Sequence, residues 1–393
     1  MSNSITALVW DDVLAGYRFG AEHPLNPRRL EITLDLIRRL GLVGNGHRPM
    51  VRPEPATDAD LLRVHAPEFI DAVKRASAGD RSPELGRFGL GTEDVPLVAG
   101  MHEAACLAVG ATLKAAELVM SGRARRAYSM AGGLHHARRA EAAGFCVYND
   151  LAVAAHWMKE VHGARVMYID IDAHHGDGVQ WLFYEDPEVL TVSFHESGTY
   201  LFPGTGYIDE VGQGDGHGFA VNVPLDAHTE DASYRAAFEE LVPALADAFR
   251  PDVILYQAGC DAHAVDPLTH LRCTTGLYHE LTRVVVEVAE RHCQGRVVAT
   301  GGGGYAIYEV VPRAWTLVWA ALCGAHPPDE LPAEWLQAMR LEHGRELPCC
   351  LRDAPGDYPA SPRRASVDET NERTVAAVRS RVLPLLTGWH LGF

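Results

Sequence analysis

The sequence predicts an α/β fold, a single domain with a mostly parallel central β-sheet flanked by helices. Short apolar segments alternate with amphipathic ones along the 393 residues, which is typical of a parallel sheet covered on both faces. Glycine-rich loops with polar side chains follow several of the apolar segments: GGLHHA, AHHGDG, FPGTG, QAGCDAH and GGGGY. Because ligands bind outside the carboxyl ends of the strands in such sheets, these loops are expected to converge on one active site.

The individual elements follow from local patterns. Strands are predicted for short apolar runs rich in β-branched and aromatic residues, at 6–10, 127–131, 165–171, 189–195, 219–223, 252–257 and 296–300. Apolar residues recur at helical spacing in 149–162, 231–249 and 277–293. From about residue 326 a C-terminal extension is expected, with a proline-containing surface loop at 347–364 and a terminal helix at 367–386.

Composition limits the classes of partner. The formal net charge of -17 argues against binding to nucleic acid or to an anionic membrane surface, which requires clustered Lys and Arg. The eight cysteines lack zinc-finger spacing, which indicates reduced thiols in a cytoplasmic protein. We recognise no signal peptide, and no apolar stretch approaches the roughly 20 residues of a transmembrane helix.

The AHHGDG loop indicates a metal site. Asp172 and His174 follow the strand at 165–171 and, on an extended backbone, would point to the same side as Asp170. Asp261 of QAGCDAH follows another apolar strand and would complete a set of two carboxylates and one imidazole. Such a set leaves one coordination position open, as catalytic sites do. Taken singly, each residue is more readily explained as a helix cap or a loop hydrogen bond.

Two further loops supply groups for proton transfer and charge stabilisation. The tandem His135 and His136 of GGLHHA are natural acid–base groups near neutral pH, and Asp170 and Asp177 are available to fix their tautomers. Tyr305 ends GGGGY and could stabilise a developing oxyanion. The alternatives are a surface histidine pair without a role and a tyrosine that only packs between loops.

Eight motifs in this order resemble the zinc-dependent histone deacetylase superfamily: GGLHHA, GFCVYND, YIDIDAHHGDGVQ, TVSFHE, FPGTG, VNVPL, QAGCDAH and GGGGY. The resemblance runs from HPLNPRRL to about residue 325, and the remainder is similar to the bacterial acetoin-utilisation branch. It implies an arginase/deacetylase-like fold and metal-dependent hydrolysis of the acetyl amide of acetyl-lysine in proteins.

The resemblance also implies roles for individual residues. Asp172, His174 and Asp261 match the zinc ligands, although Fe²⁺ also occupies such sites. His136 matches a general base and His135 an electrostatic partner, oriented by Asp170 and Asp177, while Tyr305 polarises the scissile carbonyl. The implied substrate-binding residues are Asp94, Gly144, Phe145, Phe202, Leu268 and Arg29. A structural K⁺ or Na⁺ would be held by Asp170, Asp172, His174, Ser193 and Phe194, and a second such ion near Phe183, Val189 and Phe219.

Other functions stay open at this point. An acetylpolyamine amidohydrolase would keep the same metal and histidines, but the apolar Leu268 favours acetyl-lysine in a protein. An arginase-like manganese hydrolase needs ligands for two divalent ions, and the motifs supply enough for one. A non-catalytic acetyl-lysine binder would not need Tyr305 and both histidines. Acetyl-CoA synthetase is the leading candidate for the acetylated protein substrate by resemblance, and the oligomeric state cannot be read from the sequence.

Overall fold

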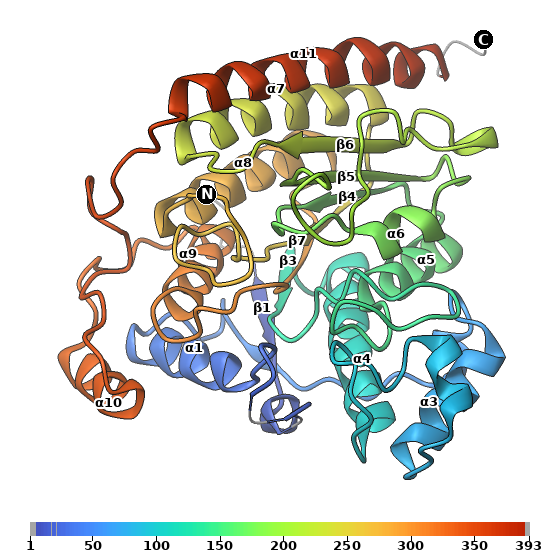
Figure 1. Cartoon of the computed structure of the whole chain (residues 1–393), viewed down its shortest axis with the longest axis horizontal. Coiled ribbons are helices and arrows are strands. Elements are labelled where there is room, and N and C mark those ends of the chain that lie inside the picture. The colour runs from blue at the N-terminus through green and yellow to red at the C-terminus, as the bar shows by residue number, and fades with distance from the viewer. Residues whose placement is uncertain (1–4, 17, 21, 390–393) are drawn as a thin grey trace.

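A computed structural model describes residues 5–16, 18–20 and 22–389. Its centre is one sheet in which every strand pairing is parallel, in the order β2-β1-β3-β8-β7-β4-β5-β6 (Figure 1). The strands are β1 Thr6–Val9, β2 Met50–Val51, β3 Arg126–Ser129, β4 Val166–Asp170, β5 Val189–Glu196, β6 Ala220–Leu225, β7 Val253–Gln257 and β8 Val297–Thr300. The predicted parallel α/β architecture is confirmed.

Helices cover both faces of this sheet. They are α1 Arg28–Arg39, α2 Asp58–Leu61, α3 Pro67–Ser77, α4 Met101–Met120, α5 Asp150–His162, α6 Asp177–Leu182, α7 Asp231–Phe249, α8 Thr275–His292, α9 Val311–Cys323, α10 Ala333–His343 and α11 Arg364–Trp389. Short 3₁₀ turns lie at Asp12–Ala15, Pro83–Phe88 and Gly214–Gly216. Helices α4 and α5 pack together on one face, and α1, α9, α8 and α7 pack in succession on the other. The C-terminal α11 lies along α7 beside the edge strand β6 (Figure 1).

The central strands form because their sequences are almost entirely apolar. VMYID of β4, VILYQ of β7 and VVAT of β8 are buried along their whole length, as expected when helices cover both faces of a sheet. All seven predicted strands are present, with ends shifted by a few residues. The two-residue β2 was not predicted, because a segment that short carries no measurable period.

Seven helices of the described residues lie outside the predicted segments, namely α1, α2, α3, α4, α6, α9 and α10. Helix α4 is apolar around most of its circumference, since 13 of its 20 residues are buried, so it lacks the one-sided stripe that marks an amphipathic helix. Helix α10 lies within the C-terminal extension, where we expected only a loop before the terminal helix. Its Trp335, Leu336 and Met339 contribute to a small apolar cluster separate from the main core.

A buried ion pair fastens the surface loop at 347–364 to the body of the protein. Arg313 on α9 donates from Nη1 to Asp353 Oδ1 at 2.8 Å, and both side chains are 1% exposed. The other oxygen of Asp353 lies 2.9 Å from His263 Nε2 and accepts from the backbone N–H of Thr275 at 2.8 Å. These contacts and the Arg313 charge hold the pKa of Asp353 well below its usual range, against the effect of burial.

Replacing Asp353 with asparagine should therefore destabilise the protein strongly. The variant leaves the Arg313 charge buried and uncompensated, at a cost of roughly 3–5 kcal/mol in the free energy of unfolding. Asp329→Asn is the matched control, because Asp329 forms a half-exposed pair with Arg352 at 3.0 Å, worth about 0–1 kcal/mol. Urea unfolding of both variants measures the difference, and equal losses would contradict this assignment.

No helix among the described residues has the length and apolar character needed to cross a membrane.

Candidate active site

The sheet register brings the functional loops together. Ser129, Thr300, Gln257, Asp170 and Ser193 are consecutive partners across β3, β8, β7, β4 and β5. Four of these residues end their strands, so the loops that follow start at one level of the sheet. This places GGLHHA, AHHGDG, QAGCDAH and GGGGY at one edge, as predicted for ligand sites in α/β sheets.

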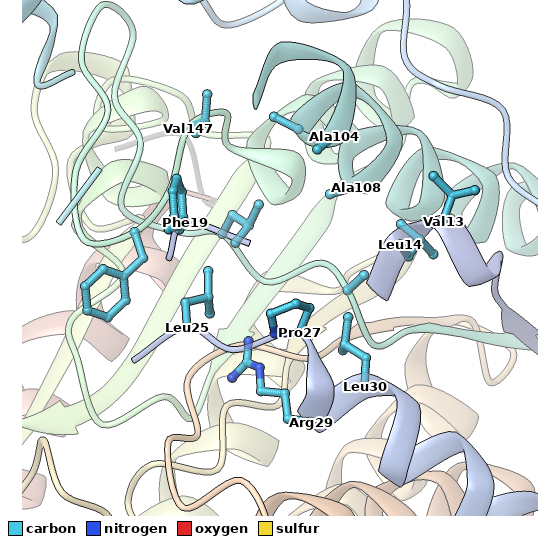
Figure 2. Close-up of a pocket in the computed structure, with 14 residues that line it drawn as sticks. Val13, Leu14, Phe19, Leu25, Pro27, Arg29, Leu30, Ala104, Ala108 and Val147 are labelled. Carbon is cyan, nitrogen blue, oxygen red and sulfur yellow. The ribbon is translucent and has the colours of Figure 1, made fainter. Parts of the chain in front are cut away.

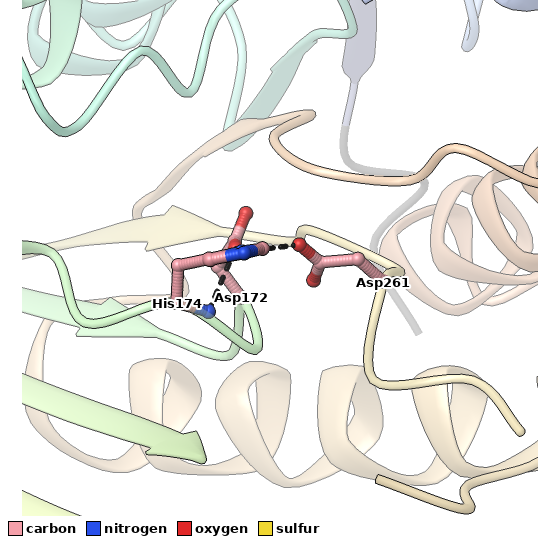
Figure 3. A group of neighbouring side chains, drawn as sticks. All are labelled: Asp172, His174 and Asp261. Atoms are coloured by element: carbon pink, nitrogen blue, oxygen red, sulfur yellow. Dashed lines mark hydrogen bonds and ion pairs between the residues drawn. The ribbon is translucent and has the colours of Figure 1, made fainter. Parts of the chain in front are cut away.

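Asp172, His174 and Asp261 form the cluster that the sequence predicted (Figure 3). One oxygen or nitrogen of each lies within 4.8 Å of the others, and all three residues are buried. His174 Nδ1 lies 2.8 Å from Asp261 Oδ2 and 3.1 Å from Asp172 Oδ1. The backbone at Asp172 and His174 is not the extended one that we expected, because β4 ends at Asp170 and the chain turns there. The turn is closed by a bond from the His174 N–H to Asp172 Oδ1 at 3.0 Å.

Surrounding donors fix the two carboxylates. Gln257 Nε2 donates to Asp172 Oδ2 at 2.8 Å, and the Gly303 N–H donates to the same oxygen at 2.6 Å. The Ala173 N–H donates to Asp261 Oδ1 at 2.7 Å. The remaining oxygens, Asp172 Oδ1 and Asp261 Oδ2, face the imidazole of His174. Such outer contacts orient metal ligands and are typical of a metal site.

The negative charge of the cluster favours binding of a cation. Burial and the nearby charge of Asp172 raise the pKa of Asp261 to about 8. Against the effect of burial, the same two carboxylates raise the pKa of His174 well above its usual range, so the pair attracts a positive charge, which a bound ion would supply in place of the His174 proton. Two carboxylates and one imidazole with an open position suit a divalent ion such as Zn²⁺. The residues present therefore fit the metal that the sequence predicts.

Gly303 is the closest backbone neighbour of the cluster, and Gly303→Ala should weaken metal binding. A Cβ at this position would overlap the Asp261 carboxylate and lie 2.9 Å from Asp172 Oδ2. We expect a loss of about 10–100-fold in metal affinity, the usual cost of disturbing groups around the ligands. Metal titration of the apo-protein measures it. Gly86→Ala, with nothing within 4 Å of the added carbon, should bind metal normally.

The tandem histidines each bind one carboxylate. His135 Nδ1 lies 2.7 Å from Asp170 Oδ2, and His136 Nδ1 lies 2.7 Å from Asp177 Oδ1. A carboxylate only accepts hydrogen bonds, so both imidazoles carry a proton on Nδ1. The Nε2 atom of each ring is then the one that can take part in the reaction. The predicted pairing of these four residues is thus present in the structure.

The two imidazoles differ in charge. Burial opposes the charged form of His135, but Asp170 and Asp172 outweigh it and raise the pKa of His135 to about 9. Burial and then the charge of His135 lower the pKa of His136 to about 4. At neutral pH His135 is therefore cationic, whereas His136 is neutral and able to accept a proton.

The hydroxyl of Tyr305 is free to donate. It makes no hydrogen bond with any residue in the described ranges, while the backbone N–H of Tyr305 donates to Asp266 Oδ2 at 2.8 Å. The phenol ring lies 6.5 Å from the His174 ring, measured between centroids. Burial raises the pKa of Tyr305 well above its usual range, with Asp261 and Asp172 acting in the same direction. The phenol therefore keeps its proton next to the metal cluster.

Aromatic rings flank this centre. The Phe145 ring lies 5.8 Å from the Tyr305 ring, and the Phe202 ring lies 5.0 Å from the His136 ring. Phe202 is 45% exposed, so its side chain reaches from the cluster to the surface. Gly144 has a φ of +49°, and a side chain there would collide with His136. Glycine is therefore required for the close approach of this wall.

The other predicted substrate-binding residues take different positions. Leu268 is partly exposed, and its N–H donates to Asp266 Oδ1 at 3.0 Å. Asp94 is exposed, and its main-chain oxygen lies 3.2 Å from His23 Nε2. The His23 ring in turn lies 4.6 Å from the Phe145 ring. Contact of Asp94 and Leu268 with a substrate stays a prediction.

Arg29 lines a small apolar cavity of about 90 Å³ (Figure 2). Its Nη1 donates to the Gly304 carbonyl at 2.9 Å, and its guanidinium stacks 5.0 Å from the Trp315 ring. Phe145 lines the same cavity, so the cavity adjoins the aromatic wall of the site. Arg29 thus lies beside a cavity, and its role there stays a prediction.

The monovalent-ion sites stay predictions as well. Asp170 and Ser193 are partners across β4 and β5, and Asp170 Oδ1 accepts from the Asp172 N–H at 3.0 Å. The Phe194 carbonyl already accepts from Tyr234 Oη at 3.2 Å. At the second proposed site, the carbonyls of Phe183 and Phe219 accept from Asp186 and Thr191, and Val189 starts β5.

Several supporting residues were missed from the sequence. Gln257 ends β7 inside the QAGCDAH motif, so its strand-end position was an available signal. Arg138 donates to Asp177 Oδ2 at 2.7 Å, and Asp266 holds the Tyr305 backbone. Asn149 donates to the carbonyls of His135 and Ala137 at 3.2 and 2.9 Å and so secures the tandem-histidine loop. The contacts of Arg138, Asp266 and Asn149 join segments that are distant in sequence, and no local pattern predicts them.

The site combines an Asp–His–Asp cluster with two histidine–aspartate dyads and a phenol that has no hydrogen-bond partner among the described residues. This combination, at the carboxyl edge of a parallel sheet, defines a metal-dependent hydrolase. A family model described as a histone deacetylase domain matches residues 23–322. The chain therefore belongs to the histone deacetylase family and is a deacetylase hydrolase. The match begins at the HPLNPRRL motif and ends close to the predicted limit of 325.

Individual relatives agree with this assignment. The acetoin utilization protein AcuC of Bacillus subtilis is 47% identical over 369 residues, which is 93% of this chain and 95% of that protein. AcuC of Staphylococcus aureus strain MSSA476 is 40% identical over 96% of this chain and 97% of its own length. The crystal structure of a histone deacetylase homologue from Aquifex aeolicus superimposes with a TM-score of 0.84, at 30% identity. The match covers 94% of this chain and all of that one. The predicted family and branch resemblance is confirmed.

Proposed function

We propose that this protein is a zinc-dependent lysine deacetylase that hydrolyses the acetyl amide of acetyl-lysine in proteins. The observation that carries the proposal is the placement of the His136 imidazole and the Tyr305 phenol beside one buried cluster of Asp172, His174 and Asp261. A base and an oxyanion donor beside a Lewis-acid site are the groups that amide hydrolysis requires.

Each group has a distinct task in this proposal. Asp172, His174 and Asp261 would hold the ion, which when bound activates water and polarises the carbonyl. His136 Nε2 accepts the proton of the attacking water, while Asp177 keeps that imidazole in the required tautomer. Tyr305 donates its phenolic proton in a hydrogen bond to the oxyanion. A histidine then protonates the departing lysine amine, and the cationic His135 stabilises negative charge nearby.

The walls of the site support an extended acyl-lysine as substrate. Phe145 and Phe202 border the site with aromatic rings, which suits the four methylene groups of a lysine side chain and excludes water. Leu268 is apolar, whereas selection of a second ammonium group in an acetylpolyamine would be favoured by a carboxylate. Asp94 is exposed and available to bind the backbone of a peptide.

A single divalent ion is proposed rather than a pair. In the part of the chain that the structure describes, Asp172, His174 and Asp261 are the one group of three or more His, Cys, Asp or Glu side chains close enough to share a metal. An arginase-like centre would need further ligands. We propose Zn²⁺, with Fe²⁺ as the alternative, and a cytoplasmic acetylated protein as the partner. Acetyl-CoA synthetase is our candidate for that role, on the resemblance of the sequence to the acetoin-utilisation branch.

Competition between two substrate classes tests the proposal. Turnover would be measured for an acetyl-lysine peptide panel, acetylated acetyl-CoA synthetase and N-acetylated polyamines, with the same zinc-loaded enzyme. We expect the peptide to be hydrolysed with the higher kcat/KM. Preference for acetylpolyamines would overturn the choice of substrate, and binding of the peptide without turnover would identify an acetyl-lysine binder instead.

A further inference from the structure

Cys349 and Cys350 form a thiol pair outside the active site. Their Sγ atoms lie 3.8 Å apart, and they occupy the loop between α10 and α11. Cys349 is exposed and Cys350 half-buried, whereas five of the other six cysteines are buried and Cys323 is half-buried. The pair is therefore accessible to solutes, and nothing in the deacetylase reaction uses it.

The backbone around the pair is held in place. The Leu331 N–H donates to the Cys349 carbonyl at 2.8 Å, and the Leu351 N–H donates to the Asp329 carbonyl at 2.6 Å. Arg313 Nη1 lies 3.3 Å from the Cys350 carbonyl on the buried side. The two sulfurs are thus presented from a fixed segment, which lowers the entropic cost of holding a ligand between them.

The distance between the sulfurs favours chelation of a metal over a disulfide. A tetrahedral metal ion lies about 2.3 Å from each thiolate, so sulfurs 3.8 Å apart subtend an angle of about 110° at the ion. A disulfide would require the sulfurs to close to about 2.05 Å. Adjacent Cα atoms are only about 3.8 Å apart, below the usual span of about 4.4–6.8 Å for a disulfide, so that bond would be strained.

The neighbouring charges also favour a cation. Glu330 is the direct antiparallel partner of Cys350, which puts both side chains on the same side of this short pairing. Burial raises the pKa of Cys350, and Cys349, Asp329 and Glu330 act in the same direction. The Cys350 thiol is thus protonated at rest, and a metal ion would release its proton when it binds.

We propose that Cys349 and Cys350 chelate one thiophilic divalent cation, of the class of Zn²⁺ and Cd²⁺, at a site separate from the catalytic cluster. The segment that carries the pair continues to Asp353, which bonds His263, two residues beyond Asp261. An ion bound to the pair would therefore sit on a segment that contacts the loop of a catalytic ligand, without contacting the catalytic residues themselves.

Cadmium titration of the zinc-loaded protein under reducing conditions tests this site. Thiolate-to-cadmium charge-transfer absorption in the ultraviolet reports only sulfur ligands, and the catalytic cluster offers carboxylates and an imidazole. We expect the absorption to rise to a plateau at one Cd²⁺ per chain, with the catalytic zinc retained. Cys349→Ser and Cys350→Ser should each lower the affinity at least 10-fold and remove most of the absorption.

Cys323→Ser, at a half-buried cysteine, is the matched control and should titrate like the wild type. Urea unfolding midpoints of all three variants confirm that each is folded, independently of any enzymatic activity. Absence of the absorption in the wild type, or its persistence in both pair variants, would overturn the proposal. A count of six free thiols in the protein isolated without reductant would also overturn it, because the pair would then be a disulfide.

Discussion

Tyr305→Phe should lower deacetylase turnover by about 10²–10³-fold, the usual effect of removing one oxyanion donor. The substitution removes a hydroxyl that has no hydrogen bond to the described residues, so neither the fold nor the metal cluster loses a contact. Because the donor acts on charge that develops during the reaction, kcat and kcat/KM should fall together, while KM changes little. Steady-state kinetics on one acetyl-lysine peptide gives both constants.

Tyr308→Phe is the matched control for this change. Tyr308 lies three residues away, and its hydroxyl bonds Glu342 at 3.0 Å, away from the metal cluster. It should retain wild-type turnover, and both variants should bind one metal ion. A Tyr305→Phe enzyme with unchanged kcat would remove this phenol from the mechanism and move the search to the backbone N–H groups of the glycine run.

His136→Ala should lower turnover by about 10²–10⁴-fold, the usual contribution of a general base. His136 is neutral at pH 7 and offers a free Nε2, whereas the charges of Asp170 and Asp172 keep His135 protonated. Loss of proton transfer should appear in kcat, with metal content unchanged. The measurement is turnover and metal stoichiometry on the same preparation.

His156→Ala is the control for the second prediction, because His156 lies on α5 and faces Glu160 at 3.6 Å. It should behave as the wild type. If His135→Ala proved far more damaging to kcat than His136→Ala, the roles of the two histidines would be reversed.

Much of the fold could be predicted because the sheet is buried on both faces. Strands such as β4 and β7 are continuous apolar runs, and the alternation with helices implies parallel connections. Several of the elements that were not predicted lacked such a pattern. The edge strand β2 has two residues, α4 is apolar around most of its surface, and α10 lies in a segment of mixed charge.

The active site could be predicted as a set of residues but not as a charge distribution. Asp172, His174, Asp261 and the tandem histidines all fall in glycine-rich loops at strand ends, where the fold class places ligands. The difference between His135 and His136 depends on burial and on which carboxylates lie nearest, so it required the structure. The role of Gly303 also required the structure, because its closeness to both ligand carboxylates follows from the packing of β7 and β8 side by side.

Stepwise metal reconstitution tests the central claim most directly, namely that one divalent ion held by Asp172, His174 and Asp261 is required for deacetylation. Chelated apo-protein would be titrated with Zn²⁺ while bound metal and turnover of an acetyl-lysine peptide are measured together, for the wild type and for Asp261→Asn. We expect wild-type activity to rise linearly to one ion per chain, and Asp261→Asn to stay inactive and bind metal weakly. Full turnover in the apo-protein, a requirement for two ions, or wild-type metal binding and turnover in Asp261→Asn would contradict the account.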